Sequence, residues 1–91
     1  MHAADALRKM RDALSGNRLI WSSHQGLRRG QRAVQVADIK DALRSASLPV
    51  QSTTNAGEAW VFTGKTETGE QLCVVVGYDD DEPTIVTVWW K

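Results

Sequence analysis

The sequence has only one cysteine, Cys73, and two prolines among its 91 residues. A single cysteine excludes an internal disulfide, so the fold must depend on its hydrophobic core. The longest apolar run falls well short of the ~18 residues that a membrane span needs, and the N-terminus lacks the apolar stretch of a signal peptide. We therefore expect one domain over residues 1–91, with no membrane segment, in the cytoplasm; a domain of a secreted effector would look the same.

Net charge is also absent, because 11 Lys and Arg residues balance 11 Asp and Glu residues. The balance conceals a division along the chain. Residues 1–50 carry nine basic and four acidic side chains, a net charge of +5, whereas residues 51–91 carry two basic and seven acidic ones, a net charge of −5. Such a separation favours an anionic partner on one side of the molecule.

The second half of the chain is rich in β-forming sequence. Residues 72–76 are all apolar, and three of them are β-branched. A half-buried strand would alternate apolar and polar residues, so we predict a strand that is covered on both faces. Similar segments at 58–64 and 84–90 flank it, with Gly69 supplying the positive φ of one connecting loop. With a short edge strand at 50–53, these segments predict a β-meander over about residues 50–91.

Helical periodicity is confined to the first half, in residues 3–15 and 36–46. We expect Gly16 to end the first helix in the left-handed conformation, and Pro49 prevents the other from continuing. The apolar stripes of these two helices are Ala3, Leu7, Met10 and Leu14, and Val36, Ile39, Leu43 and Ala46. A short strand at 17–21 and a helix at 24–29 are predicted between them. The fold class is therefore α+β, with the N-terminal helices of about residues 1–48 packed on one face of a small twisted antiparallel sheet.

The segment 24–32 contains the strongest candidates for a functional site: His24, Arg28, Arg29 and Arg32. Arginine side chains bind phosphate oxygens at two points, and a histidine that titrates near neutral pH can transfer protons. On a helix, His24 and Arg28 would lie one turn apart on the same face. The segment could thus bind RNA phosphate; the other interpretation is a solvated helix with a structural histidine.

Trp89 and Trp90 are neighbours in a predicted strand, so one should face the helices and the other the open side of the sheet. An outward tryptophan could stack on a base or anchor a protein partner. The acidic residues 79–82 lack the spacing of a calcium loop, and two histidines with one cysteine are too few for a zinc site. We predict neither a metal site nor a cofactor.

The order of these features resembles a family of small bacterial proteins similar to the BrnT and RelE/ParE toxins of type II toxin–antitoxin systems. The resemblance spans about residues 19–91. It rests on His24, the segment 28–32, Val34, the helix from Val36, a strand ending in Phe62-Thr63-Gly64-Lys65, Gly69, and the strands at 71–76 and 85–88. It implies a RelE-like fold and a metal-independent endoribonuclease, in which an RNA 2′-hydroxyl attacks the adjacent phosphate. It also implies a cognate antitoxin or immunity protein that covers the site.

By position, the resemblance implies that His24, Arg32 and Lys65 are catalytic; Lys65 stands where the family often has arginine. Arg28 and Arg29 would bind the RNA or the ribosome, and Trp89 or Trp90 would stack on a base. The alternative function is a non-catalytic interaction module, similar to an antitoxin or an immunity partner. Such a module would bind through the sheet face and the two C-terminal tryptophans.

Overall fold

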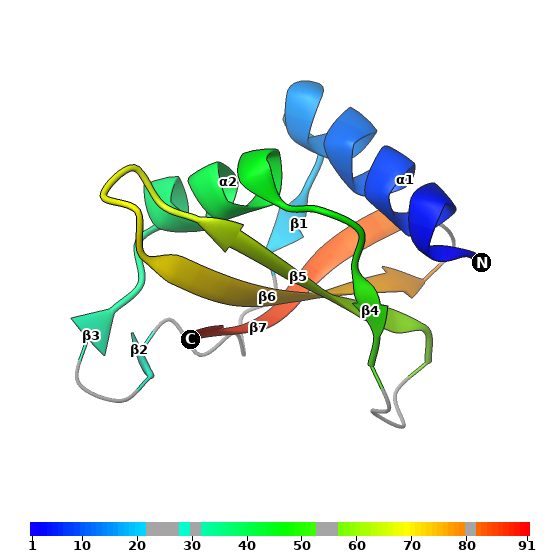
Figure 1. Ribbon diagram of the computed structural model, residues 1–91. Coiled ribbons are helices and arrows are strands. Elements are labelled where there is room, and N and C mark those ends of the chain that lie inside the picture. Colours follow the sequence, from blue (N-terminus) through cyan, green and yellow to red (C-terminus); the bar gives the residue numbers. More distant parts are fainter. Residues whose placement is uncertain (22–27, 30–31, 53–56, 80–81) are drawn as a thin grey trace.

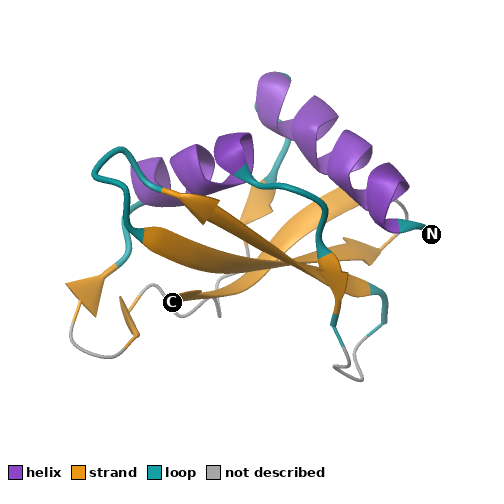
Figure 2. Cartoon of the chain, viewed as in Figure 1, coloured by secondary structure: helices purple, strands orange, loops and turns teal. Residues whose placement is uncertain are grey.

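The computed structural model describes residues 1–21, 28–29, 32–52, 57–79 and 82–91. The elements within them are α1 (Ala3–Ser15), β1 (Ile20–Trp21), β2 (Arg28–Arg29), β3 (Arg32–Ala33), α2 (Val36–Ser45), β4 (Val50–Gln51), β5 (Ala59–Lys65), β6 (Gln71–Asp79) and β7 (Glu82–Trp90). Both helices cover the same face of one sheet (Figures 1 and 2). The α+β prediction is therefore confirmed. Neither of these helices is long and apolar enough to cross a membrane.

The main sheet has five strands in the order β1-β7-β6-β5-β4. Strands β5, β6 and β7 form the predicted antiparallel meander, with a register irregularity between Val75 and Val76. Strand β1 pairs with β7 in parallel, so the sheet is mixed rather than wholly antiparallel as predicted. This pairing is possible because α2 and five strands separate β1 from β7 in the chain, and a parallel pair needs a long connection.

The helix predicted at 24–29 is wrong for Arg28 and Arg29, which form β2 and pair with β3; residues 24–27 lie outside the described part of the chain. The reason is visible in the sequence. Gly26 and Gly30 both disfavour a helix, and Leu27 is the only large apolar residue available for a buried stripe. Strand β2 lies next to β7, at the end of the molecule opposite β4 (Figure 1).

Strand β6 is the centre of the core, as predicted. Its residues 72–76 are all buried, and α2 packs over β5 and β6 while α1 packs over β7. The largest fully buried side chains belong to α1, α2 and the three long strands: Met10, Ile39, Leu43, Phe62, Leu72, Val74, Val76, Ile85 and Val88. The lone thiol of Cys73 is also buried, on the face of β6 that points away from the helices.

Both helices have the predicted bounds to within one residue, but two details differ. Val36, assigned to the buried stripe of α2, is 44% exposed because it is the first residue of that helix. Gly16 is not left-handed: Asn17 has φ 55° instead. The N–H of Arg18 donates to the Ala13 carbonyl at 2.7 Å, which completes a Schellman motif around Asn17. Asparagine adopts this conformation more readily than most residues with a Cβ.

Tyr78 joins β6 to α1. Its hydroxyl donates a 2.6 Å hydrogen bond to the Ala6 carbonyl, and both residues are buried. We expect Tyr78→Phe to lower the free energy of unfolding by about 1–2 kcal/mol, because the variant removes a buried hydrogen bond and leaves a carbonyl with fewer partners. Urea denaturation measures this difference, and an unchanged midpoint would show that the bond contributes nothing.

Burial raises the pKa of the Tyr78 hydroxyl above its ordinary value of 10.0. Above pH 10 the unfolded chain loses this proton while the folded protein retains it, so the unfolded state binds fewer protons and stability falls as pH rises. The expected slope is at most about 1.4 kcal/mol per pH unit from this group. Tyr78 is the only tyrosine, so tyrosinate absorbance reports its titration directly, and Tyr78→Phe should remove this part of the alkaline destabilisation.

Candidate functional site

The ends of β5, β6 and β7 place three polar side chains in one row. Lys65 and Gln71 are register partners, and the N–H of Lys91 donates to the Gln71 carbonyl at 3.0 Å. In each strand these residues alternate with the core-facing ones, so all three side chains lie on the face without helices, which we call the open face. We call Lys65, Gln71 and Lys91 the basic row. Adjacent strands are about 4.8 Å apart, so the two lysines start from backbone positions roughly 10 Å apart.

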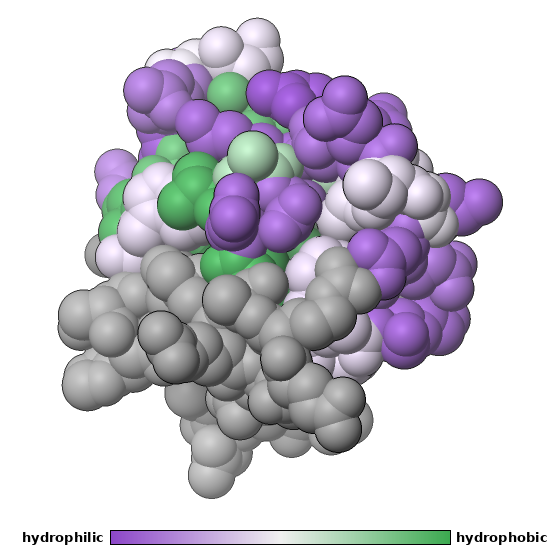
Figure 3. Space-filling model, turned by 90° about the vertical axis from the view of Figure 1, so that its left-hand side faces the viewer, coloured by the Kyte–Doolittle hydropathy of each residue, from purple (hydrophilic) through white to green (hydrophobic). Residues whose placement is uncertain are grey.

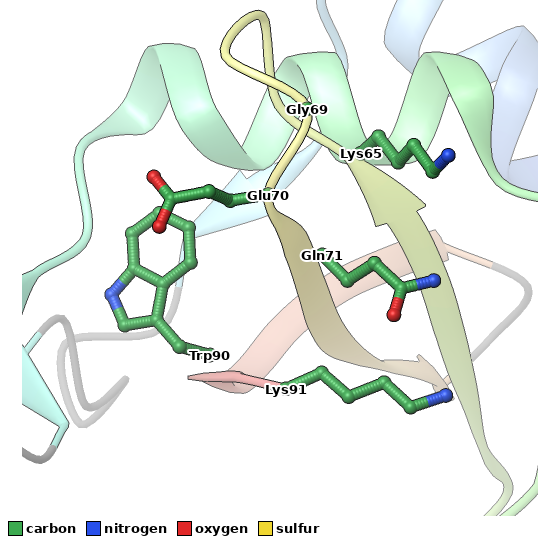
Figure 4. A pocket seen from close by; sticks show the side chains of 6 residues that line it. All are labelled: Lys65, Gly69, Glu70, Gln71, Trp90 and Lys91. Atoms are coloured by element: carbon green, nitrogen blue, oxygen red, sulfur yellow. The ribbon is translucent and has the colours of Figure 1, made fainter.

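A hollow of about 500 Å³ lies at this end of the sheet. The basic row lines it together with Gly69, Glu70 and Trp90. Figure 4 shows the side chains of the basic row extending in the same direction, whereas Trp90 and the Glu70 carboxylate lie on the other side, close to one another. Glu70 also accepts a hydrogen bond from the Thr68 hydroxyl at 3.2 Å, which holds its carboxylate toward the loop. The hollow therefore has two ammonium groups on one side and an indole on the other.

Close packing of α2 on β5 positions Lys65. A Cβ added to Gly64 would overlap the carbonyl of Ala42, so only glycine allows this approach. Since neighbouring residues point to opposite faces, the side chain of Lys65 must emerge on the open face. The Gly-Lys pair in the sequence thus has two structural roles. The glycine allows α2 to pack closely on β5, and the lysine is the first residue of the basic row.

The two tryptophans face opposite sides, as predicted. Trp90 packs against the core beneath the helices, whereas Trp89 pairs with Cys73 on the open face and is 37% exposed. Trp89 lies two residues before Lys91 and therefore on the same face as the basic row. Val86 and Val50, in β7 and β4, are also exposed, at 41% and 72%. The strand ends thus combine a cationic edge with a partly apolar surface.

For three of the other predicted site residues, the structure gives only the strand in which each lies. Arg28 and Arg29 lie in β2 and Arg32 in β3, with Arg29 and Arg32 as register partners, and β2 lies beside β7. Their side chains, and the whole of His24, lie outside the described part of the chain. Lys65 and Trp90 line the same hollow. A shared site for His24, Arg32 and Lys65 stays a prediction.

Three residues of the hollow were missed by sequence reasoning: Glu70, Gln71 and Lys91. A signal for two of them was present. Lys91 is two residues beyond Trp89, which places it on the same strand face, and Lys65 and Gln71 flank the Gly69 loop at the positions where a hairpin closes. Glu70, as a loop residue, gave no periodic signal.

The lining of the hollow is predominantly polar, with Lys65, Glu70, Gln71 and Lys91 among its six residues. Figure 3 views the end of the molecule that carries the loop between β5 and β6, on the left in Figure 1, and shows hydrophilic surface above and to the right of a smaller hydrophobic area. Among the described residues, no group of three or more His, Cys, Asp or Glu side chains is placed to hold a metal ion. The groups available for chemistry in the hollow are therefore ammonium, carboxamide, carboxylate and indole.

This protein is an α+β domain with both helices on one face of its sheet and the basic row at the end of the open face. Residues 21–90 match the protein family described as a domain of unknown function, DUF4258, and the chain belongs to that family. The match begins after α1, at the second residue of β1, and includes strands β2 to β7 and the basic row except Lys91. No curated protein and no solved structure matches the chain at a significant level. The family description names no activity, so the likeness to toxins stays a prediction.

Proposed function

We propose that this protein is a metal-independent endoribonuclease of the RelE/BrnT toxin type that acts on RNA in the cytoplasm. The observation that supports this proposal most directly is the basic row, in which Lys65 and Lys91 flank Gln71 on one face of the sheet. Two ammonium groups and a carboxamide donor suit the non-bridging oxygens of a phosphodiester. The exposed ring of Trp89 on the same face is available to stack on an unpaired base.

The proposed reaction needs charge stabilisation and two proton transfers. The RNA 2′-hydroxyl attacks the adjacent phosphorus and loses its proton to a base, for which we propose His24. The bond from phosphorus to the 5′-oxygen breaks, and that oxygen receives a proton, with Lys65 as the proposed donor. Lys91 and Arg32 stabilise the charge that develops on the phosphate, and Arg28 and Arg29 bind the flanking backbone. The products are a 2′,3′-cyclic phosphate and a 5′-hydroxyl.

The test is cleavage of free RNA by purified protein with and without excess EDTA, cleavage in the presence of ribosomes in Mg²⁺ buffer, and growth after induced expression. We expect growth arrest, and RNA fragments that end in 2′,3′-cyclic phosphate, formed from free RNA at rates that EDTA does not change. Intact RNA under both conditions, with normal growth, would overturn the proposal. A cognate antitoxin or immunity protein is the expected partner, and its addition should stop cleavage.

A non-catalytic interaction module is the second candidate, and the exposed apolar side chains of the open face favour it. Trp89, Val86 and Val50 are all more than one-third exposed, which is typical of a surface that a protein partner covers. For this function, a partner purified with the protein from its host should be lost when Trp89→Ala is introduced and retained in Lys65→Gln. The reverse pattern, with binding that weakens steeply as salt rises, would instead indicate an RNA ligand.

A further inference from the structure

The last residue of α2, Ser45, contacts the backbone of Lys65. The N–H of Lys65 donates to Ser45 Oγ at 2.7 Å, and Ser45 Oγ lies 3.1 Å from the Lys65 carbonyl oxygen. The same hydroxyl also lies 3.1 Å from the Asp41 carbonyl and 3.2 Å from the Ala42 carbonyl. The Ser45 hydroxyl thus accepts one hydrogen bond from β5, and three carbonyl oxygens lie within reach of the single proton that it can donate.

The contact with Ser45 supplies hydrogen bonds that a neighbouring strand would otherwise make to the outer edge of β5. Strand β4 pairs with β5 only at Trp60 and Val61, so it does not reach the outer edge of β5 at Lys65. Gln71 fixes Lys65 on the inner side, and Ser45 binds its backbone on the outer side. Gly64, next to it, is pressed against the Ala42 carbonyl of the same helical turn. The last turn of α2 therefore holds the end of β5 at two successive residues, directly before the loop at 66–70.

We infer that Ser45 is a positioning residue for Lys65: its hydroxyl fixes the backbone from which the lysine side chain reaches the reacting phosphate. This inference rests on the proposed function. Ser45 itself is exposed and lies in α2, on the helix-covered side, so it acts through Lys65 and not on the RNA. Misplacement of a reacting group by about 1 Å lowers rates by up to about 100-fold. Loss of the hydrogen bonds between Ser45 and Lys65 is expected to have part of that effect.

The experiment compares RNA cleavage by Ser45→Ala, Ser45→Thr, Lys65→Gln and the double variant Ser45→Ala/Lys65→Gln. We expect Ser45→Ala to lower kcat about 10-fold with KM changed less than about twofold, because accurate placement matters more in the transition state than in the bound ground state. Ser45→Thr keeps the hydroxyl and should restore kcat to within about threefold of the wild type. The double variant should be no slower than Lys65→Gln alone, because the two residues then act as one unit.

Ser15→Ala is the matched control. Ser15 is the last residue of α1, as Ser45 is of α2, and in the described part of the chain its hydroxyl has no hydrogen bond to a strand. It should leave kcat unchanged. If Ser45→Ala cleaves as the wild type does, or if its effect multiplies with that of Lys65→Gln, the positioning role is wrong while the proposed function stands. If wild type does not cleave RNA, or Lys65→Gln cleaves it normally, both the inference and the catalytic role of Lys65 are overturned.

Discussion

Gly64→Ala is expected to destabilise this protein more than any other single methyl addition to a glycine whose surroundings the structure shows. The added Cβ would overlap the Ala42 carbonyl, which is backbone inside a helix and cannot rotate away. Either α2 must move off β5 or the strand must bend, and both separate the buried contacts of Leu43 and Phe62. We expect a loss of at least about 3 kcal/mol, a large share of the roughly 5–13 kcal/mol that a chain of this length has.

Gly77→Ala is the matched control, because Gly77 also lies in a long strand of the same sheet. There the added Cβ would be 3.2 Å from Cγ2 of Val86, a side chain on the exposed surface that can shift. We expect a change within about 1 kcal/mol, since alanine also reduces the entropy of the unfolded chain. Urea denaturation of both variants measures the difference. Equal losses would mean that α2 does not approach β5 as closely as the structure shows.

The largest expected effect on activity is that of Lys65→Gln/Lys91→Gln. Both substitutions remove a positive charge but keep a polar side chain of similar length, so the sheet should fold as before. With the two ammonium groups gone, the basic row no longer compensates the charge that builds up on the phosphate. We expect kcat/KM for RNA cleavage to fall at least about 100-fold. RNA binding should also become less salt-dependent, with the slope of log K against log salt reduced by about 1.4 for two contacts to single-stranded RNA.

Lys9→Gln is the control for charge alone. Lys9 is in α1 and lines a separate hollow with Glu82 and Pro83, at the start of β7. Lys91 follows the other end of that nine-residue strand, so the two lysines are separated by roughly 25–30 Å of strand. Cleavage should be close to wild type in Lys9→Gln. An equal loss in both variants would indicate a general effect of net charge, and no loss in the double variant would remove the basic row from the proposed mechanism.

Several elements were predictable because they depend on local pattern. The uninterrupted apolar run at 72–76 predicted a strand buried on both faces, and the alternation at Trp89 and Trp90 predicted opposite orientations; both are confirmed. The helical bounds followed from periodicity and from Pro49. The failures have a common origin. The strands β2 and β3 have two residues each, which is too short for a periodicity to be detected. A strand was predicted at 17–21, where β1 lies, but its parallel pairing with β7 joins segments far apart in the chain and leaves no local pattern.

The candidate site was predictable only in part. Lys65 was identified from a resemblance and Trp90 from its place in a predicted strand, and the structure places them around the same hollow. Lys91 and Gln71 were not assigned a role, because their proximity to Lys65 depends on hydrogen-bond register across two hairpins rather than on spacing in the chain. Register shifts of a single residue would have moved each of these side chains to the opposite face.

The sequence by itself determined the fold class, the central strand and the alternation of side chains between the two faces of a strand, because alternation and hydrophobic periodicity are properties of neighbouring residues. Tertiary structure decided which strands are adjacent and at which register, and therefore that Lys65, Gln71 and Lys91 meet at one end of the sheet. It also decided that α2 lies directly on Gly64 and that Ser45 reaches Lys65. These contacts join residues far apart in the chain, and only packing of the whole core selects them from the pairings that local preferences allow.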